Sequence, residues 1–504
     1  MSLYGYTLYT LFRRNARIFK DRVALVSGEQ RVCYGTLLDS VDRLACGLTA
    51  AGLTAGQRIG ILAKNSIEYM YLYGAAAKTG AVLLPINWRL NQEEIEYIIS
   101  DGAPAALFVD PEFHDMISPA TTAAGFLGKC FSMGEAQGAF EAFGALMRNN
   151  GVGRQADLNG GDAYVIIHTA AVHGRPRGAV LTHQGPLLAA LQLAHRWGLT
   201  QDDLNLVALP LFHIAGLALA LCAIGTGGSN IILPRFDVDL ALKHIKEDRV
   251  TFFGEFPPML KGLLDKAEEG SHDLSSIKHV LGLDHPDTVR KFQEMSGGTF
   301  WAVYGQSETS GLVTVAPYFE RFGSAGIPLE LAEVEIMDDR ANILRPGNSG
   351  EIVARGPLVF KGYWNLDKDT EHTFRDGWHH TGDRGRIDED GYLWFEGRAP
   401  EKELIKPGGE NVYPAEIEKV ILDHGDVKDV VVIGVPDAQW GEAIKAVCVL
   451  NEGADLAPAD LIEFVAARIA RFKKPKYVVF VPELPKSADG SFDREKIKAD
   501  FGKA

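Results

Sequence analysis

The sequence predicts an α/β protein with a large N-terminal multi-layer α/β region, a β-rich subdomain and a small C-terminal α+β domain. Three observations support this fold class. The 504 residues exceed what one hydrophobic core usually holds. Short β-branched runs alternate with helix-length segments up to about residue 330, which is typical of parallel βαβ units. Beyond that point, strand-like pieces follow one another with Gly and Asp between them.

Composition and charge exclude several classes of protein. An apolar content of 46% with 23% charged residues is ordinary for a globular chain. The net charge of −15 argues against a nucleic-acid partner, because phosphate backbones bind basic surfaces. The five cysteines are widely spaced and form no CxxC pair, so neither a disulfide framework nor a zinc site is predicted. A reducing, cytoplasmic location fits this pattern.

The N-terminal region is expected to begin with an amphipathic helix within residues 1–19. Charges interrupt its apolar pattern and no small-residue cleavage site follows, so it is not interpreted as a signal peptide. Strands are expected near residues 23, 58, 81, 105, 164, 230 and 279. Residues 204–234 carry no charge, yet Pro210, His213 and several glycines interrupt them. We interpret them as strand, loop, helix and strand in the core, without a membrane span.

The C-terminal part changes in texture. AEVEIMD, GEIVARG and GYLWFEG predict the β-rich subdomain after about residue 330. Past Arg398, EIEKVILDH and LIEFVAARIARF have helical patterns, whereas DVVVIGV, AVCVLN and YVVFV are typical of strands. The predicted boundary falls near Gly397 and gives domains 1–397 and 398–504.

One stretch, from Gly377 to Glu418, is the most informative in the chain. Asp383 and Arg398 stand fifteen positions apart on either side of a short acidic hairpin. A carboxylate can accept both hydroxyls of a ribose, and a guanidinium nearby can reach a hydroxyl or a phosphate. Either residue alone is as well explained as a surface charge beside a turn. Together they are candidates for binding an adenosine nucleotide.

The whole stretch closely resembles the adenylate-forming enzymes, the superfamily of acyl-CoA synthetases, luciferases and peptide-synthetase adenylation domains. The resemblance runs in order from about residue 20 to residue 497. It implies that Asp383 and Arg398 hold the ribose of ATP and that the small domain is mobile. It further implies an AMP-forming acyl-CoA ligase that activates a hydrophobic or aromatic carboxylic acid as acyl-AMP and transfers it to CoA. ATP, Mg²⁺ and CoA are the implied cofactors, with fatty acid metabolism as the setting.

The segment from Thr169 to Ala179 resembles the phosphate-binding loop of that family. Glycines such as Gly178 let backbone amides approach phosphate, while Arg175 and Arg177 supply positive charge. The sequence departs from the family here, because Ala, Ala, Val and His replace its run of hydroxyl and glycine residues. The Arg-Pro-Arg-Gly end, taken alone, is also a common basic turn.

The segment from Tyr304 to Glu308 resembles another family motif. There the aromatic residue packs beside the adenine and the acyl group, Gly305 follows it, the hydroxyl residue, here Ser307, meets the α-phosphate, and the glutamate binds magnesium. A carboxylate beside a phosphate site repels it unless a hard cation lies between them. Glu308 is therefore the expected metal ligand and, with Thr169 and His213, a predicted catalytic residue.

The acyl and thiol sites are predicted from shorter matches. His213 matches a position that lines the acyl site in the family, although a solitary histidine in an apolar stretch also fits simple core packing. Residues 282–286 are expected to edge the acyl pocket. Gly408 and Gly409 resemble the turn that borders the pantetheine tunnel after the small domain rotates. Thiol attack demands little of side chains, because a free thiol near pKa 8.5 is already partly ionised.

Two positions near the C-terminus depart from the family. Ser491 stands where the family has a lysine that spans the carboxylate and the α-phosphate, and serine cannot neutralise that charge. Pro400 stands at the hinge position, where its fixed φ would restrict rotation and shift the hinge to Glu401 or Lys402. Two alternatives follow: an adenylation-impaired homologue acting mainly on acyl-AMP or acyl-CoA, or a non-catalytic paralogue that binds them. A homodimer is left open.

Overall fold

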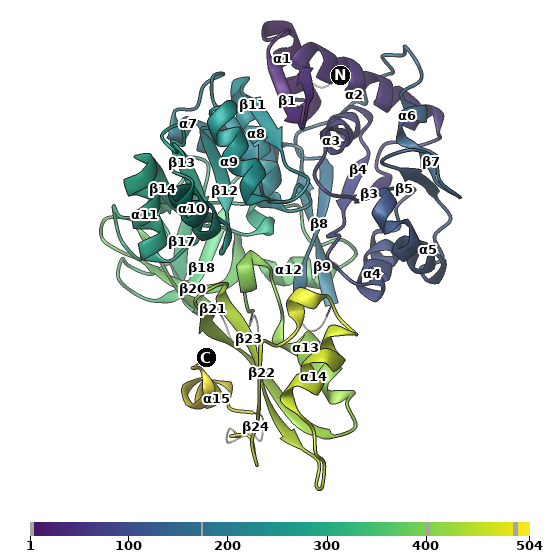
Figure 1. Ribbon diagram of the computed structural model, residues 1–504. Coiled ribbons are helices and arrows are strands. Elements are labelled where there is room, and N and C mark those ends of the chain that lie inside the picture. The colour runs from purple at the N-terminus through teal and green to yellow at the C-terminus, as the bar shows by residue number, and fades with distance from the viewer. Residues whose placement is uncertain (1–4, 173–174, 399–403, 487–491, 504) are drawn as a thin grey trace.

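The structure, a computed structural model, describes residues 5–172, 175–398, 404–486 and 492–503, apart from the side chains of residues 170–172 and 175. Figure 1 shows a large N-terminal region above a small C-terminal domain, drawn in yellow. Both are mixtures of helices and strands, so the predicted α/β class is confirmed.

A nine-stranded sheet forms one half of the N-terminal region. Its order is β16-β15-β14-β13-β12-β10-β11-β1-β2. The bounds are Ile327–Pro328, Thr314–Pro317, Thr299–Tyr304, His279–Gly282, Phe252–Glu255, Leu204–Val207, Ser229–Ile232, Val23–Ser27 and Gln30–Cys33 in that order. The strands from β1 to β14 pair in parallel, so their carboxyl ends lie along one edge of the sheet.

A seven-stranded sheet forms the other half, in the order β7-β6-β5-β3-β4-β8-β9. The bounds are Glu141–Ala142, Lys129–Ser132, Ala106–Val109, Arg58–Leu62, Val82–Pro85, Ala163–Val172 and Arg175–Thr182. Its inner strands are parallel, and β9 folds back antiparallel on β8. All seven strands anticipated from the sequence in the N-terminal region occur in these two sheets.

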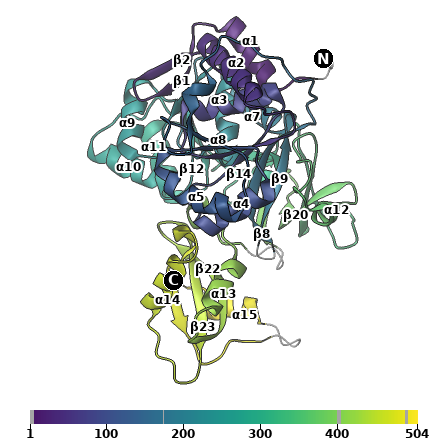
Figure 2. The same cartoon turned by 90° about the vertical axis from the view of Figure 1, so that its right-hand side faces the viewer.

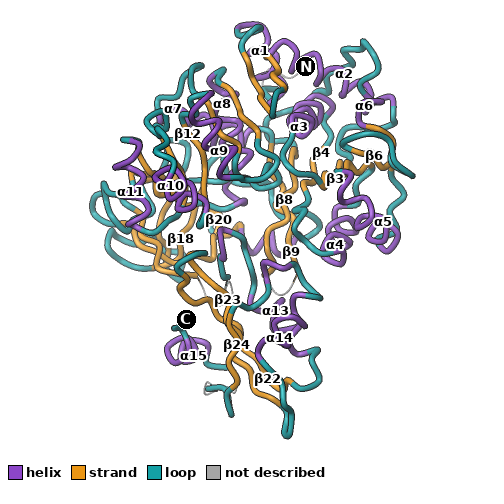
Figure 3. Tube along the Cα trace, in the orientation of Figure 1, coloured by secondary structure: helices purple, strands orange, loops and turns teal. Residues whose placement is uncertain are grey.

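Helices cover both sheets and fill the space between them (Figure 3). The shared core joins both sheets through α1 (Leu8–Ile18), α2 (Tyr34–Ala50), α3 (Ile67–Thr79), α7 (Gln184–Trp197) and α8 (Ile214–Thr226). The outer face of the nine-stranded sheet packs on α9 (Val238–Glu247), α10 (Met259–Glu269) and α11 (Pro286–Ser296). The outer face of the seven-stranded sheet packs on α4 (Gln92–Gly102) and α5 (His114–Ala123). In the part of the chain described, no helix combines the length and apolar character needed to cross a membrane.

The β-rich subdomain and the C-terminal domain follow in sequence. The first is a sheet of β17 (Glu333–Met337), β18 (Gly350–Arg355), β19 (Phe374–Arg375), β20 (Trp378–Ile387) and β21 (Leu393–Arg398). The second packs α13 (Pro414–Leu422), α14 (Pro458–Ala466) and α15 (Arg494–Phe501) around β22 (Val427–Asp437), β23 (Gly441–Leu450) and β24 (Tyr477–Phe480). In Figures 1 and 2 the C-terminal domain hangs below the ends of β8 and β9. The expected boundary at residue 397 adjoins residues outside the description and stays a prediction.

The segment after the strand near residue 164 differs from the expected loop. β8 continues to Val172 and β9 begins at Arg175, so these residues form a hairpin in which Thr169 pairs with Arg177. Alanine and valine stand in place of the family's hydroxyl and glycine residues here, and residues with a Cβ favour an extended backbone more than glycine does.

Candidate active site

The two candidate ribose-binding residues lie opposite each other. Asp383 of β20 pairs with Arg398 of β21, and directly opposed residues of antiparallel strands project on the same face. The Asp383 side chain is buried, and its Oδ2 accepts hydrogen bonds from the Tyr304 hydroxyl at 2.8 Å and from the Gln306 amide at 2.6 Å. Burial, followed by the Asp383 charge, raises the pKa of Tyr304. The carboxylate is therefore fixed in orientation by neutral donors.

Arg398 connects this pair to the C-terminal domain. Its Nη1 donates a hydrogen bond to the carbonyl oxygen of Leu404 at 2.6 Å. The guanidinium carbon also lies 5.7 Å from the ring centroid of Phe395. The site therefore lies where the N-terminal region meets the residues that lead into the small domain.

Glu308 and Arg177 are joined through a tyrosine. Glu308 is buried on the short 3₁₀ helix Ser307–Thr309, and its Oε1 accepts a hydrogen bond from the Tyr363 hydroxyl at 2.8 Å. The Arg177 guanidinium lies over the Tyr363 ring, 4.0 Å from its centroid, and Nη1 is 3.2 Å from Asp369. Burial and then the Glu308 charge raise the pKa of Tyr363. The expected metal ligand and phosphate-site cation are thus close together.

The hairpin supplies the remaining phosphate-site candidates. The Thr169 hydroxyl donates a hydrogen bond to the Arg177 carbonyl at 3.3 Å, across the two strands. Gly178 packs closely, since a Cβ there would lie 2.7 Å from Cγ2 of Ile166. Arg175 begins β9, but its side chain lies outside the description. Thr169 and Arg177 are brought together, although both already have partners.

Gly305 and Ser307 belong to the turn after β14. A Cβ at Gly305 would overlap the carbonyl oxygen of Gly311, so only glycine allows this close approach of two backbones. Ser307 lines a pocket together with Thr169 and His213. Thr169 and Ser307, predicted at the phosphates, and His213, predicted at the acyl site, therefore line the same pocket.

His213 has two contacts that define its state. It is the N-cap of α8, where Nδ1 accepts a hydrogen bond from the Ala215 amide at 3.2 Å. Burial, and then the charges of Lys406 and Arg89, lower the pKa of His213 to about 4. The imidazole is therefore neutral at pH 7. It both caps the helix and lines the pocket, so the packing and acyl-site interpretations are compatible.

The Gly408–Gly409 turn of the C-terminal domain lies against the N-terminal region. Both glycines have positive φ, 57° and 81°. A Cβ would lie 2.9 Å from the Trp440 ring at Gly408 and 2.5 Å from the Phe256 ring at Gly409. The turn lines a second pocket with His213 and Phe256. Only glycine allows this close approach of the turn to the two aromatic rings.

Several residues of the site carried no sequence signal that we used. The additional side chains are Arg89, which pairs with Glu410 across the domains, Tyr363 and Tyr413. Burial raises the pKa of Tyr413, and the charges that act on it belong to Glu308, Arg177, Arg398 and Asp383. The string GYWN around Tyr363, upstream of the acidic hairpin, was the available clue.

Glu308 is the carboxylate expected to bind magnesium. No group of three or more His, Cys, Asp or Glu side chains in the described ranges is placed to hold a metal. Tyr363 engages one oxygen of Glu308 and leaves the carboxylate able to bind a cation through the other. Mg²⁺ is commonly held by one or two carboxylates together with substrate phosphates and water. The site fits a magnesium–nucleotide complex and does not fit a metal held by protein alone.

Ser491, Pro400, Glu401 and Lys402 lie outside the described residues.

The described fold and site define a nucleotide-dependent enzyme whose site is shared by two domains. Comparison with known proteins agrees with this class. The model of the AMP-binding enzyme family matches residues 12–364, and that of the AMP-binding enzyme C-terminal domain matches residues 416–491.

Two curated relatives and one solved structure cover nearly the whole chain. An indoleacetate–CoA ligase of Aromatoleum aromaticum is 32% identical over 493 residues, 96% of both chains. A feruloyl-CoA synthase of an Amycolatopsis species is 33% identical over 497 residues, 97% of this chain and 98% of that one. The o-succinylbenzoate CoA synthetase of Bacillus subtilis, with its product analogue bound, has a TM-score of 0.84, 27% identity and 97% coverage of both chains. The chain belongs to the AMP-binding enzyme family, and the predicted adenylate-forming superfamily is confirmed.

Proposed function

We propose that this protein is an AMP-forming acyl-CoA ligase that activates a hydrophobic or aromatic carboxylic acid. One observation supports the proposal: the charges of Asp383, Arg398 and Glu308 all act on Tyr413 of the C-terminal domain, and the Gly408–Gly409 turn of the same domain lines a pocket with His213. The relatives named as CoA ligases match the chain along nearly its full length, which supports the same reaction class here.

In the first half-reaction the acid's carboxylate attacks the α-phosphorus of ATP, and pyrophosphate leaves. Asp383 and Arg398 hold the ribose, which fixes the α-phosphate near Ser307. Glu308 would hold magnesium, which when bound neutralises phosphate charge. Neutral His213 lines the acyl site without adding a charge that would hold the carboxylate away from phosphorus. These roles rest on position and orientation, which can lower a barrier by several kcal/mol.

In the second half-reaction the CoA thiol attacks the acyl-AMP carbonyl, and AMP leaves. The described orientation suits this step, because Gly408 and Gly409 line one pocket with His213. The likeness to a synthetase bound to a CoA product analogue supports the same conclusion. The pocket lined by His213, Phe256, Gly408 and Gly409 is the proposed path of the pantetheine arm.

A second candidate is favoured by the β8–β9 hairpin. Arg177, the cation expected at the phosphates, is engaged by Asp369 and Tyr363, and Thr169 by the Arg177 carbonyl. With Ser491 in place of lysine, these contacts weaken the ATP-dependent half-reaction more than the thiol-dependent one. The protein would then act mainly on acyl-AMP or acyl-CoA.

Two assays separate these candidates. Pyrophosphate exchange into ATP, measured across a panel of acids, reports adenylation, and CoA acylation from synthetic acyl-AMP reports thioester formation. A full ligase is active in both, whereas the second candidate shows acylation with exchange near background. S491K restores the missing charge, so it should raise exchange and leave acylation unchanged. Absence of both activities, together with AMP binding by calorimetry, would favour a non-catalytic binding protein.

The remaining parts of the proposal concern the setting. All five cysteines are free thiols, and their spacing suits a reducing compartment, so we place the enzyme in the cytoplasm. Mg²⁺, ATP and CoA are its proposed cofactors, and fatty acid or aromatic acid metabolism is its proposed context. Gel filtration with light scattering tests whether it forms a homodimer.

A further inference from the structure

Glu255 stands at an unusual place for a carboxyl group. It is the last residue of β12, and in the parallel register it pairs with Gly282, the last residue of β13. In open α/β sheets, ligands bind just beyond the carboxyl ends of the strands. Gly282 also opens the segment 282–286 that the sequence predicts at the edge of the acyl pocket.

The Glu255 carboxyl has fewer polar partners than its burial would demand. The residue is 0% exposed, and among the described residues neither carboxyl oxygen has a hydrogen-bond partner within bonding geometry. Burial, followed by the nearby Asp284 charge, raises the pKa of Glu255 well above its usual range, while the Leu260 amide has the opposite, smaller effect. A buried polar group without a hydrogen bond is costly to folding. Such a group is therefore expected to be retained for a use other than stability.

Glycine at position 282 makes room for this carboxyl. A Cβ at Gly282 would lie 2.5 Å from Oε1 of Glu255, so any larger residue would displace the side chain. Asp284 follows two residues later with a second unused oxygen. Its Oδ1 accepts a hydrogen bond from the His285 amide at 2.6 Å, whereas Oδ2 is buried and among the described residues has no hydrogen bond of good geometry. Burial raises the pKa of Asp284, and the His285 amide and the Thr288 side chain oppose that shift. Two carboxyls with spare acceptor capacity thus lie at or beside the segment 282–286, which the sequence predicts at the edge of the acyl pocket.

The residues next to Glu255 in the sequence and in space belong to the rest of the site. Helix α8 begins directly after His213 and packs against β12. Phe256, the residue after Glu255, lines the pocket that also contains His213 and Gly409. Successive side chains of an extended segment point to opposite sides. Phe256 therefore faces the pocket proposed for the pantetheine arm, and the Glu255 side chain points to the opposite side, next to Gly282.

Resting on the proposed ligase function, we infer that Glu255 and Asp284 recognise a hydrogen-bond donor on the acid, at the end remote from its carboxylate. The substrate class is then a carboxylic acid that carries a distal hydroxyl, amide or amine. An acid ending in a methyl group or an unsubstituted ring would leave both carboxyls desolvated and without partners. Sites built to bind a donor discriminate strongly against analogues that lack it.

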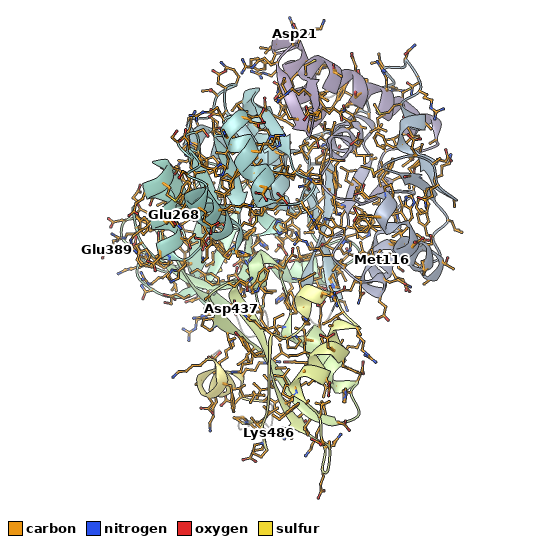
Figure 4. All side chains as sticks on the ribbon, viewed as in Figure 1. Asp21, Met116, Glu268, Glu389, Asp437 and Lys486 are labelled. Carbon is orange, nitrogen blue, oxygen red and sulfur yellow. The ribbon has the colours of Figure 1, made fainter. Side chains whose placement is uncertain are left out.

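The test uses 3-phenylpropanoic acids that differ only in the para substituent: hydrogen, methyl, hydroxyl or aminomethyl. Four proteins are compared: the wild type, Glu255→Met, Glu255→Gln and the control Glu389→Gln. The rate of acyl-CoA formation gives kcat/KM for each acid. The shift in melting temperature caused by each acid in the presence of AMP reports binding of that acid. Glu389 is exposed on the β-rich subdomain, at the outer edge of the molecule in Figure 4. The hydroxyl and aminomethyl acids separate recognition of a neutral donor from recognition of a cation.

We expect the wild type and Glu389→Gln to prefer a donor-bearing acid by at least about tenfold. Glu255→Met abolishes that preference while raising the melting temperature, because it removes an unpartnered buried carboxyl. Equal use of methyl and hydroxyl acids by the wild type, or a preference that survives in Glu255→Met, overturns the inference and leaves the ligase function standing. If no acid forms acyl-CoA, the ligase function fails. The thermal shifts of the wild type and Glu255→Met with methyl and hydroxyl acids then decide whether Glu255 recognises a donor.

Discussion

At the scale of single residues, the site depends on fixed protonation and fixed orientation. The Tyr304 hydroxyl and the Gln306 amide both donate to one oxygen of Asp383. Asp383 is thereby held in place before any nucleotide arrives. Preorganisation of this kind lowers the cost of binding, because the side chain loses little additional freedom when it contacts the ribose. Glu308 is held in the same way by Tyr363.

Glu308 is expected to matter for only one half of the reaction. Glu308→Gln removes the proposed magnesium ligand but keeps the shape and the contact with Tyr363. Pyrophosphate exchange should then fall by about a hundredfold or more, the scale of losing one preorganised electrostatic contact. Acylation of CoA from synthetic acyl-AMP should fall less than tenfold, since no triphosphate takes part. Equal losses in the two assays would contradict this division of roles.

Buried neutral histidines make the protein sensitive to acid. His183 is 1% exposed and stacks on Tyr164, and burial lowers its pKa to about 4, with the Asp162 charge opposing that shift. The unfolded state binds more protons than the native state between this value and about 6.5. The contribution of neutral His183 to the free energy of unfolding is therefore fully present above pH 6.5 and is lost as the pH falls toward 4.

His183→Phe tests this directly. The phenyl ring keeps the stacking on Tyr164 and has no group to protonate. Between pH 7 and pH 4 the free energy of unfolding should fall less for the variant than for the wild type. The difference between the two falls should be on the order of 3 kcal/mol, which corresponds to the whole lowering of the His183 pKa. Denaturant titrations at both pH values measure the difference. Parallel curves for the two proteins would show that His183 does not carry the effect.

At the scale of elements, the sequence predicted the regular parts of the fold well. Runs such as Val23–Ser27 and Val82–Pro85 are buried parallel strands, which are read as continuous apolar segments. Phe252–Glu255 was not anticipated, because it ends in a carboxyl whose burial no local pattern indicates. The extension of β8 through Val172 also escaped prediction, since pairing with β9 is a contact with a later segment of the chain.

The same limit applies to the candidate site. Asp383, Arg398 and Glu308 could be found because each lies in a local motif, and in the structure the charges of all three act on Tyr413. The contacts of Arg89 with Glu410 and of Lys473 with Glu94 join segments more than 300 positions apart. Such pairs depend on how the two domains dock. Local spacing in the sequence contains no record of them.

The hairpin gives a prediction at this scale. Replacing Ala171 with Gly and Val172 with Thr restores glycine and hydroxyl character at the turn of β8 and β9. Glycine loosens the extended backbone, and the threonine hydroxyl adds a donor to phosphate worth about 1.5–3 kcal/mol. Pyrophosphate exchange should rise at least tenfold. Unchanged exchange would mean that the hairpin does not limit adenylation.

At the scale of the whole molecule, charged contacts hold the two domains in the described orientation. Lys473 of the C-terminal domain is buried between Glu416 of its own domain and Glu94 of α4. Arg89 and Glu410 form a second contact across the same junction. Removing one partner of a buried ion pair is costly, because the other charge stays without compensation. These pairs should therefore stabilise the orientation that suits thiol attack.

Glu94→Gln is expected to weaken that orientation selectively. CoA acylation from acyl-AMP should slow by about tenfold, and pyrophosphate exchange, which does not use this orientation, should be unchanged or faster. Glu93→Gln, an exposed neighbour on the same helix, is the matched control and should behave as the wild type. A similar loss in both variants would attribute the effect to helix charge and not to the domain contact.

The most direct test of the whole account is to follow the phosphorus of ATP during turnover with a donor-bearing aryl acid and CoA, using ³¹P magnetic resonance beside mass spectrometry of the thioester. The account predicts AMP, pyrophosphate and acyl-CoA in equal amounts, all abolished by Asp383→Ala. Appearance of ADP and orthophosphate, or an undiminished yield from Asp383→Ala, would contradict it.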